Sequence, residues 1–211
     1  MNIKQNIKLF IPEIFFILIS FISSILKKNQ LFDGYDQLFK QNISVKTIYG
    51  EYGCGKSTMF VMKNYKIPIY SVDTSKFWID KIQKENNSIL NIKHIDLGEI
   101  GNWGRPKGYE YRSNFLDYTH WIWKQKSKPN LILIDGRFRV SCFLTSLKFG
   151  DEGTKIIFDD YTNRRHYHIV EEFLKPIQFN ERQALFIVPN KSTLDIKKIE
   201  LEINKFSYVM D

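Results

Sequence analysis

The sequence predicts an α/β fold in which a mostly parallel sheet is covered by helices on both faces. Short apolar runs rich in β-branched residues alternate along the chain with segments of helical periodicity. These runs are nearly continuous, which indicates strands that are buried on both faces. With 211 residues and a hydrophobic content of 43%, the chain is long and apolar enough to bury a domain core.

The elements follow in the order that such a fold requires. Strands are predicted at residues 45–49, 67–72, 92–95, 131–134 and 155–158. Helices are predicted at residues 57–64, 74–84, 113–126, 138–147 and 193–208. Two further apolar runs, 177–179 and 184–188, flank a short polar turn. We expect them to pair as an antiparallel hairpin near the end of the chain.

The N-terminal region has a different character. Residues 9–26 are mostly apolar, with Lys4 and Lys8 before them and Lys27 and Lys28 after them. The charge-free part, 14–26, is shorter than the roughly 20 residues that a membrane span needs. No small-residue cleavage site follows it, so a signal peptide is not favoured. We expect residues 1–29 to form a hydrophobic helix that associates with a membrane or packs on the domain of residues 30–211.

Charge and cysteine content limit the partners and the cellular location that are expected for this chain. The formal charge of +8 is compatible with an anionic partner, but the basic residues are scattered and mostly lysine, so nucleic acid is not favoured. Cys54 and Cys142 are the only cysteines and lack neighbours at metal-ligand spacing. A cytoplasmic location is therefore expected, at the inner face of the membrane if the N-terminal helix associates with it. The oligomeric state stays open.

The segment GEYGCGKST, residues 50–58, fits more than one kind of phosphate or nucleotide site. As G-x-x-x-x-G-K-S it matches the loop of nucleotide hydrolases, in which Lys56 would reach the phosphates and Ser57 would hold magnesium. A dinucleotide-binding loop would need a third glycine where Thr58 stands. The hydrolase pattern leaves Asp73, at the end of the second predicted strand, without a role.

A third interpretation uses the acidic and glycine residues together. Gly53 and Gly55 allow close approach of a ligand to the backbone, and Glu51 can accept a hydrogen bond from a cationic amino group. Asp73, at the tip of the next strand, is placed to accept the hydroxyls of a ribose. A ligand with an amino-acid end and a nucleoside end satisfies both acids, and S-adenosylmethionine has that shape.

At these positions the sequence resembles the class I S-adenosylmethionine-dependent methyltransferases. The resemblance rests on TIYGEYGCGKST, YSVD, HID and LILIDG, and it covers roughly residues 45–190. It implies a Rossmann-like, doubly wound sheet of seven strands. It also implies that Glu51, Gly53 and Gly55 contact the methionine part, Asp73 the ribose and Asp96 the adenine side. Lys56 departs from the family pattern, since many members carry a third glycine there.

A narrower resemblance concerns metal-dependent O-methyltransferases. IDGRFR and the later IIFDDY look like the segments that bind a divalent metal in that branch. It implies Asp135, Asp159 and Asp160 as ligands of magnesium or manganese, with Asp135 and Asp159 taking part in catalysis. Arg137 stands where that branch often has an acidic residue, which instead favours a substrate with a negative charge.

The expected activity is methyl transfer to a hydroxyl of a small molecule or a glycan precursor. His166, beyond the fifth strand, is a candidate general base, and Arg137 and Trp103 are candidate substrate contacts. Two alternatives stay open at this point: a nucleotide hydrolase or kinase using Lys56 and Ser57, and a methyltransferase-like domain that binds without catalysis.

Overall fold

The computed structural model describes residues 30–85 and 89–211. The chain divides after Asp36 into two units, and each is described here by itself. In the first unit the described residues form one 3-10 helix, η1 (Leu31–Gly34). The predicted hydrophobic helix at 1–29 lies outside the described residues. Among the helices that are described, none has the length and apolar character of a membrane span.

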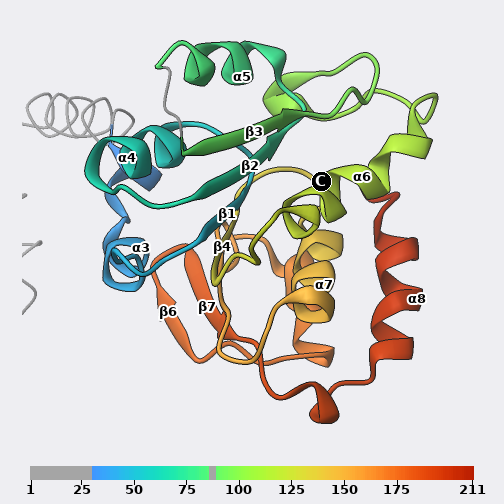
Figure 1. Ribbon diagram of the computed structural model, residues 1–211. Helices are drawn as coiled ribbons and strands as arrows, with labels where there is room; N and C mark the ends of the chain where they lie inside the picture. The colour runs from blue at the N-terminus through green and yellow to red at the C-terminus, as the bar shows by residue number, and fades with distance from the viewer. Residues whose placement is uncertain (1–29, 86–88) are drawn as a thin grey trace, which may run out of the picture. The chain divides into compact units, whose positions relative to one another are not determined.

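The described part of the second unit, Gln37–Asp211, is built on one sheet of seven strands in the order β3-β2-β1-β4-β5-β7-β6 (Figure 1). The strands are β1 (Tyr49–Tyr52), β2 (Ile69–Asp73), β3 (Leu90–His94), β4 (Leu131–Ile134), β5 (Lys155–Phe158), β6 (Gln178–Asn180) and β7 (Gln183–Ile187). The first five pair in parallel, and β7 pairs antiparallel with β5 and β6. The predicted α/β class, the mostly parallel sheet and the hairpin are confirmed.

Helices cover both faces of this sheet (Figure 1). The α-helices are α3 (Gln37–Asn42), α4 (Lys56–Asn64), α5 (Lys76–Gln83), α6 (Phe115–His120), α7 (Arg139–Phe149) and α8 (Ile196–Phe206). The 3-10 helices are η2 (Asn102–Gly104), η3 (Arg112–Asn114), η4 (Trp121–Lys124), η5 (Arg165–Glu172) and η6 (Lys191–Thr193). Helices α3, α4 and α5 lie on one side of the sheet, and α6, α7 and α8 lie on the other.

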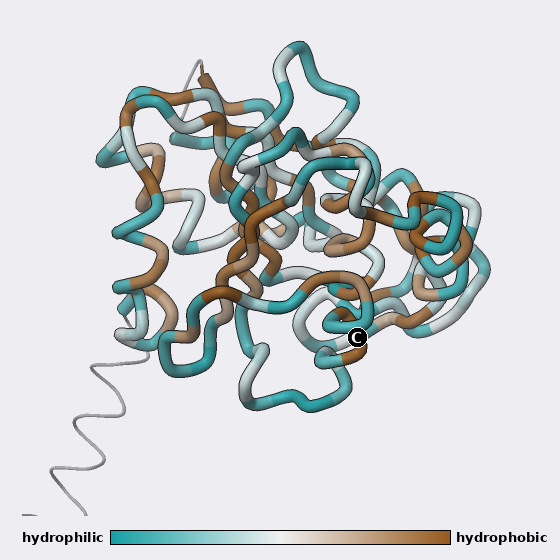
Figure 2. The backbone as a smooth tube through the Cα atoms, turned by 90° about the horizontal axis from the view of Figure 1, so that it is seen from below, coloured by the Kyte–Doolittle hydropathy of each residue, from teal (hydrophilic) through white to brown (hydrophobic). Residues whose placement is uncertain are grey.

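The larger part of the core lies between the sheet and α6, α7 and α8. Because side chains alternate along a strand, Tyr52, Ile134 and Phe158 all face this side, where they join one buried cluster with Phe143 of α7. A smaller cluster on the other face joins α4 and α5 around Ile82. The central strands are accordingly the most hydrophobic part of the trace in Figure 2.

The first strand begins later than predicted. Residues 45–49 were expected to form it, but Val45 is 81% exposed and the N–H of Thr47 donates to the carbonyl of Ser44 in a turn. The strand instead runs from Tyr49 to Tyr52 and takes in Glu51. The glycine loop therefore starts at Gly53, and Glu51 is a buried strand residue rather than a loop residue.

The predicted helix at 113–126 is divided into η3, α6 and η4. The side chain of Tyr52 connects α6 and η4 to β1. Its hydroxyl donates to the carbonyl of Thr119 at 2.6 Å and accepts from the indole N–H of Trp123 at 2.8 Å. Trp121 and Trp123 pack against the core. These tryptophans thus have a structural role in the aromatic segment.

Candidate functional site

The carboxyl ends of β1, β2 and β4 meet at one edge of the sheet. The strand order places β1 between β2 and β4, so the order of the strands reverses between β1 and β4. Open parallel sheets bind ligands at such a switch point, outside the carboxyl ends of the strands. Most of the predicted site residues follow directly after these strands.

The loop after β1 is shaped by two glycines in different environments. Gly53 has a φ of +94°, which favours glycine, and a Cβ there would lie 2.6 Å from the Cα of Gly136 in the loop after β4. The two loops therefore touch each other. A Cβ on Gly55, by contrast, would meet no heavy atom within 4 Å. Beside Gly55 the loop therefore leaves space for a ligand, and the contact of Gly55 with a ligand stays a prediction.

Glu51 lies under this loop rather than at its surface. Its side chain is fully buried and accepts hydrogen bonds from Tyr49 at 2.9 Å and Ser71 at 3.1 Å, and also from Ser57 and Thr58 of α4. Burial raises the pKa of Glu51 to about 7, although the four hydroxyls partly oppose this. The predicted contact of Glu51 with a ligand is therefore not supported, because all four hydroxyls belong to the protein. Its carboxyl group ties the start of α4 to β1 and β2.

The same contacts bear on the nucleotide-hydrolase pattern. The hydroxyl of Ser57, which would hold magnesium in such a loop, is buried and directed at Glu51. Lys56 is the first residue of α4 and is exposed. The geometry around Ser57 therefore matches a helix anchor and not a magnesium ligand.

Asp73 stands at the end of β2 against the glycine loop. One carboxyl oxygen accepts the N–H of Cys54 at 2.7 Å, and the other accepts the N–H of Ser75 at 2.6 Å. The side chain is nearly buried, and burial raises the pKa of Asp73. The structure thus brings Asp73 to the loop after β1, as the spacing predicted.

The segment after β3 continues the site with Asp96 and Trp103. Asp96 is exposed, and its carboxylate accepts the N–H of Gly98 at 2.9 Å. Trp103 lies on a turn held by the N–H of Gly101 bonded to the carbonyl of Arg105, 2.7 Å away. The next residue, Gly104, accepts a hydrogen bond from Thr74, the neighbour of Asp73, at 2.7 Å.

Trp103 has an unusual conformation for a bulky residue. Its φ is +61°, a backbone conformation that is unfavourable for a bulky residue. Trp103 is also 88% exposed, so burial of its side chain does not compensate for this strain. Strained residues of this kind concentrate at functional sites. The hydrogen bond from Thr74 to Gly104 holds the turn that carries Trp103 next to the end of β2, with Trp103 open to solvent. The contact of Trp103 with a substrate stays a prediction.

The three predicted metal ligands come together but are paired with arginines. Oxygen atoms of Asp135, Asp159 and Asp160 lie within 4.8 Å of one another. Arg139 donates to Asp135 at 3.1 Å and to Asp160 at 3.3 Å, and Arg182 donates to Asp159 at 3.0 Å. A guanidinium group therefore contacts every one of these carboxylates. The predicted magnesium or manganese is not supported, because a divalent cation would have to displace these arginines.

This ion-pair network is largely internal. Asp159 is fully buried, and Arg139 is 3% exposed at its side chain. Burial and the neighbouring Asp159 raise the pKa of Asp135, while Arg139 opposes the increase. Asp135 keeps 30% of its side chain exposed, more than Asp160 at 15% and Asp159 at 0%, so it is the most accessible of the three carboxyl groups.

No motif of the sequence indicates that Arg182 belongs to this network. Arg139 also donates to the carbonyls of Gly136 and Asp159, at 3.0 and 2.7 Å. Arg182 reaches the network from the turn between β6 and β7. A motif search finds the acids because they follow strands directly. Arg182 lies between β6 and β7, and a motif of residues that follow β4 or β5 directly does not specify where this turn lies in the fold.

The residues predicted to face the substrate lie beyond β4 and β5. Arg137 is partly buried next to the start of α7, and no hydrogen bond or ion pair of its guanidinium is found within the described residues. Burial is the main cause that lowers the pKa of Arg137, and the positive charge of neighbouring Arg139 lowers it further. His166 of η5 is 61% exposed, and its Nε2 lies 3.9 Å from a carboxyl oxygen of Asp211. The structure thus brings Arg137 and His166 to the same end of the sheet.

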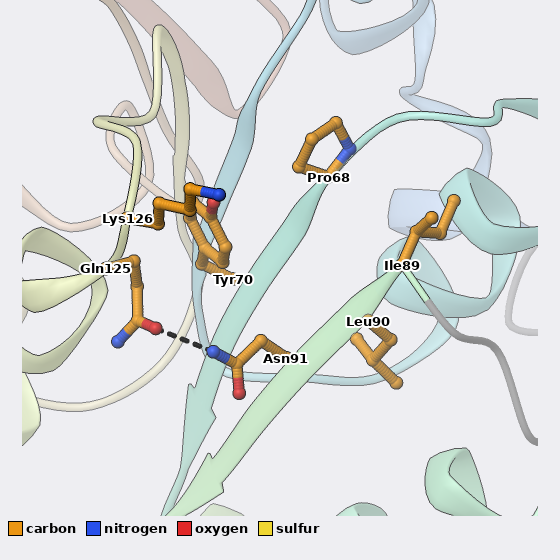
Figure 3. A pocket seen from close by; sticks show the side chains of 7 residues that line it. All are labelled: Pro68, Tyr70, Ile89, Leu90, Asn91, Gln125 and Lys126. Atoms are coloured by element: carbon orange, nitrogen blue, oxygen red, sulfur yellow. Dashed lines mark hydrogen bonds between the residues drawn. The ribbon is translucent and has the colours of Figure 1, made fainter.

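A pocket at the opposite end of the sheet is a separate feature (Figure 3). It has a volume of about 310 Å³ and is lined by Pro68, Tyr70, Ile89, Leu90, Asn91, Gln125 and Lys126. A hydrogen bond of 2.6 Å joins the amides of Asn91 and Gln125. The pocket lies where β2 and β3 begin, whereas ligands of parallel sheets bind where the strands end. We therefore do not assign it to the site around Asp73.

Solved structures resemble this chain, whereas protein-family models and curated proteins do not. No model of a protein family matches the sequence, and no curated protein matches it. A methyltransferase-like protein from Silicibacter pomeroyi matches with a TM-score of 0.65 and 28% identity. The match covers 77% of this chain and 88% of that protein.

Two other matches are more distant. The N-methyltransferase NodS from Bradyrhizobium japonicum, in complex with S-adenosylhomocysteine, has a TM-score of 0.47 and 15% identity, over 77% of this chain and 90% of its own. An RNA methyltransferase from Salinibacter ruber has a TM-score of 0.45 and 11% identity, over 75% and 90%. Of these three, the Silicibacter pomeroyi match bears on the assignment, and it confirms the resemblance to class I methyltransferases predicted from the sequence. The narrower resemblance to metal-dependent O-methyltransferases stays a prediction.

Proposed function

We propose that this chain, which is a class I methyltransferase-like protein, binds S-adenosylmethionine and methylates a hydroxyl group of a small molecule or a glycan precursor. The observation that carries the proposal is the pairing of Asp73 with the glycine loop. Both carboxyl oxygens of Asp73 are oriented by backbone N–H groups, one of them from Cys54 in the loop. An acid at the end of β2, next to an open glycine loop after β1, suits a ligand that carries a ribose.

The residues around the loop fit this cofactor. The open space beside Gly55 lets a ligand approach the backbone, and the absence of a side chain on Gly53 lets the loop after β1 lie against Gly136 of the loop after β4. We assign the ribose hydroxyls to Asp73 and the adenine side to Asp96. Glu51 acts as a positioning residue, because it holds Ser57 and Thr58 at the start of α4 beneath the loop.

Transfer to a hydroxyl group requires positioning and removal of a proton. When bound, S-adenosylmethionine supplies an electrophilic methyl group. Asp135 is the first candidate base, because its pKa is raised and it adjoins the glycine loop. His166 is the second, since an imidazole is a common base near neutral pH. Arg137 and Trp103 are assigned to the acceptor. The carboxylates of Asp159 and Asp160 are paired with arginines, so we assign no metal to them.

Binding measurements test the cofactor assignment. Titration calorimetry should show binding of S-adenosylmethionine and no comparable binding of ATP with magnesium. Replacing Asp73→Asn should weaken binding by at least about tenfold, because hydrogen bonds to a charged acceptor are lost. Asp80→Asn, at an exposed position on α5, is the matched control. Unchanged affinity of the Asp73 variant, or stabilisation by ATP alone, would contradict the proposal.

Activity measurements then separate the two candidate bases. Hydroxylated small molecules and glycan precursors are screened as acceptors, and the released S-adenosylhomocysteine is quantified. Asp135→Asn should lower the turnover number and leave cofactor affinity intact if Asp135 removes the proton. The same pattern for His166→Gln, with full activity of the Asp135 variant, would assign the role to His166 instead.

A further inference from the structure

The guanidinium of Arg137 makes no hydrogen bond or ion pair with the described part of the chain. Its Nε atom is buried and has no hydrogen-bond partner, and none of the ion pairs that hold the neighbouring acids includes it. The residue as a whole is partly buried, and a charged group that is partly withdrawn from water is normally paired. Arg137 follows β4 by three residues, which places it at the end of the sheet where the acceptor should lie.

Asp211 lies next to the start of α7 and also has a polar atom without a hydrogen-bond partner among the described residues. One carboxyl oxygen accepts the N–H of Arg139, the first residue of α7, at 3.2 Å. The other is buried and has no hydrogen-bond partner among the described residues. Figure 1 shows how the chain returns from α8 to this end of α7.

Several charged or titratable side chains lie near the Asp211 carboxylate. Nε2 of His166, on η5, lies 3.9 Å from one of its oxygens. The charge of Asp211 also acts on Arg137 in the loop after β4, on Cys142 of α7 and on Tyr167 of η5.

The guanidinium of Arg139 is paired with Asp135 and Asp160, so Arg139 contributes its backbone N–H here. The positive charge of Arg137 and the N-terminal end of an eleven-residue helix favour an anion at this position. Phe138, between the two arginines, has a φ of +55°, which is strained for a bulky residue.

We propose that the Asp211 side chain occupies a binding site for an anionic group of the acceptor, and that a carboxylate or phosphate of the acceptor takes its place. The incoming anion accepts the N–H of Arg139 and pairs with Arg137. Asp211 then acts as a tethered competitor that keeps the site filled until the acceptor arrives. The assignment to the acceptor rests on the function proposed above, whereas the anion site itself does not.

Removal of the competitor is the direct test. Binding of inorganic phosphate and of acetate is measured by titration, with ionic strength held constant, for the wild type and for Asp211→Ala. The variant should bind at least one of the two anions about tenfold more tightly, since the site no longer contains a carboxylate. The preferred anion tells whether the acceptor carries a phosphate or a carboxylate. Equal affinity in wild type and variant would overturn the proposal.

Two further variants separate the role of the charge from that of the helix start. Asp211→Asn can still accept the N–H of Arg139 but has no charge, so it keeps the helix cap and should also bind the anion more tightly. Arg137→Gln in the Asp211→Ala background should lose the gain. Lys197→Gln in that background removes one exposed charge at the far end of α8 and should retain it. Loss of the gain in the Lys197 variant would show a general effect of charge, and would refute the site.

The anion titrations test the anion site independently of whether the protein binds S-adenosylmethionine. If S-adenosylmethionine fails to bind but Asp211→Ala gains phosphate affinity through Arg137, the anion site holds and the proposed function fails. If the cofactor binds and no variant changes anion affinity, the proposed function holds and the anion site is wrong.

Discussion

Replacing Glu51→Gln should change how the stability of this protein depends on pH. The carboxyl group is fully buried, and burial raises its pKa from 4.5 to about 7. Between these two values the unfolded chain has lost the Glu51 proton while the folded chain keeps it. The folded state therefore binds more protons, and stability falls as pH rises through this window. A shift of about 2.5 units at 1.36 kcal/mol each corresponds to about 3 kcal/mol.

Glutamine imitates the protonated form, because it offers one acceptor oxygen and one donor group to the surrounding hydroxyls. The free energy of unfolding is measured with urea from pH 4 to pH 8 for both proteins. The difference, wild type minus variant, should decrease by about 3 kcal/mol across the series.

Other titrating groups, including Asp73 and Asp135, are present in both proteins and cancel in this difference. Glu85→Gln, at an exposed position after α5, controls for the loss of one carboxyl group. Parallel curves for the wild type and the Glu51 variant would refute the reasoning, since they would show that Glu51 is already ionised in the folded protein.

Three further outcomes are expected from the geometry of the site. Arg139→Met should cost about 3–5 kcal/mol in urea unfolding because it leaves buried acids unpaired, whereas exposed Arg165→Met should cost less than about 0.5 kcal/mol. Gly53→Ala should lose at least about 2 kcal/mol through its positive φ and the contact with Gly136, whereas Gly55→Ala should keep stability and weaken cofactor binding. Magnesium or manganese should leave the melting temperature unchanged, and a clear rise that is lost in Asp160→Asn would contradict the ion-pair assignment.

Local sequence patterns predicted most of the fold. The strands at 131–134 and 155–158 and the helix at 57–64 match β4, β5 and α4 closely, because a buried parallel strand and its following helix are encoded by residues adjacent in sequence. The first strand was placed too early, since an apolar run does not tell which of its residues will be buried. The segment at 113–126 was read as one helix, because its breaks depend on contacts with Tyr52 from β1.

The site divides in the same way. The residue pattern alone indicates that Gly53, Gly55 and Asp73 lie close together, because the ends of neighbouring parallel strands meet at one edge of a sheet. In contrast, the folded chain was needed to show that Glu51 faces four hydroxyls of the protein and that arginines neutralise the acids after β4 and β5. The physical reason is that the ionic and hydrogen-bond partners of a buried group come from segments distant in sequence, such as Arg182 for Asp159 and Asp211 for the start of α7. Their chemistry is visible in the sequence, but their distances exist only in the folded chain.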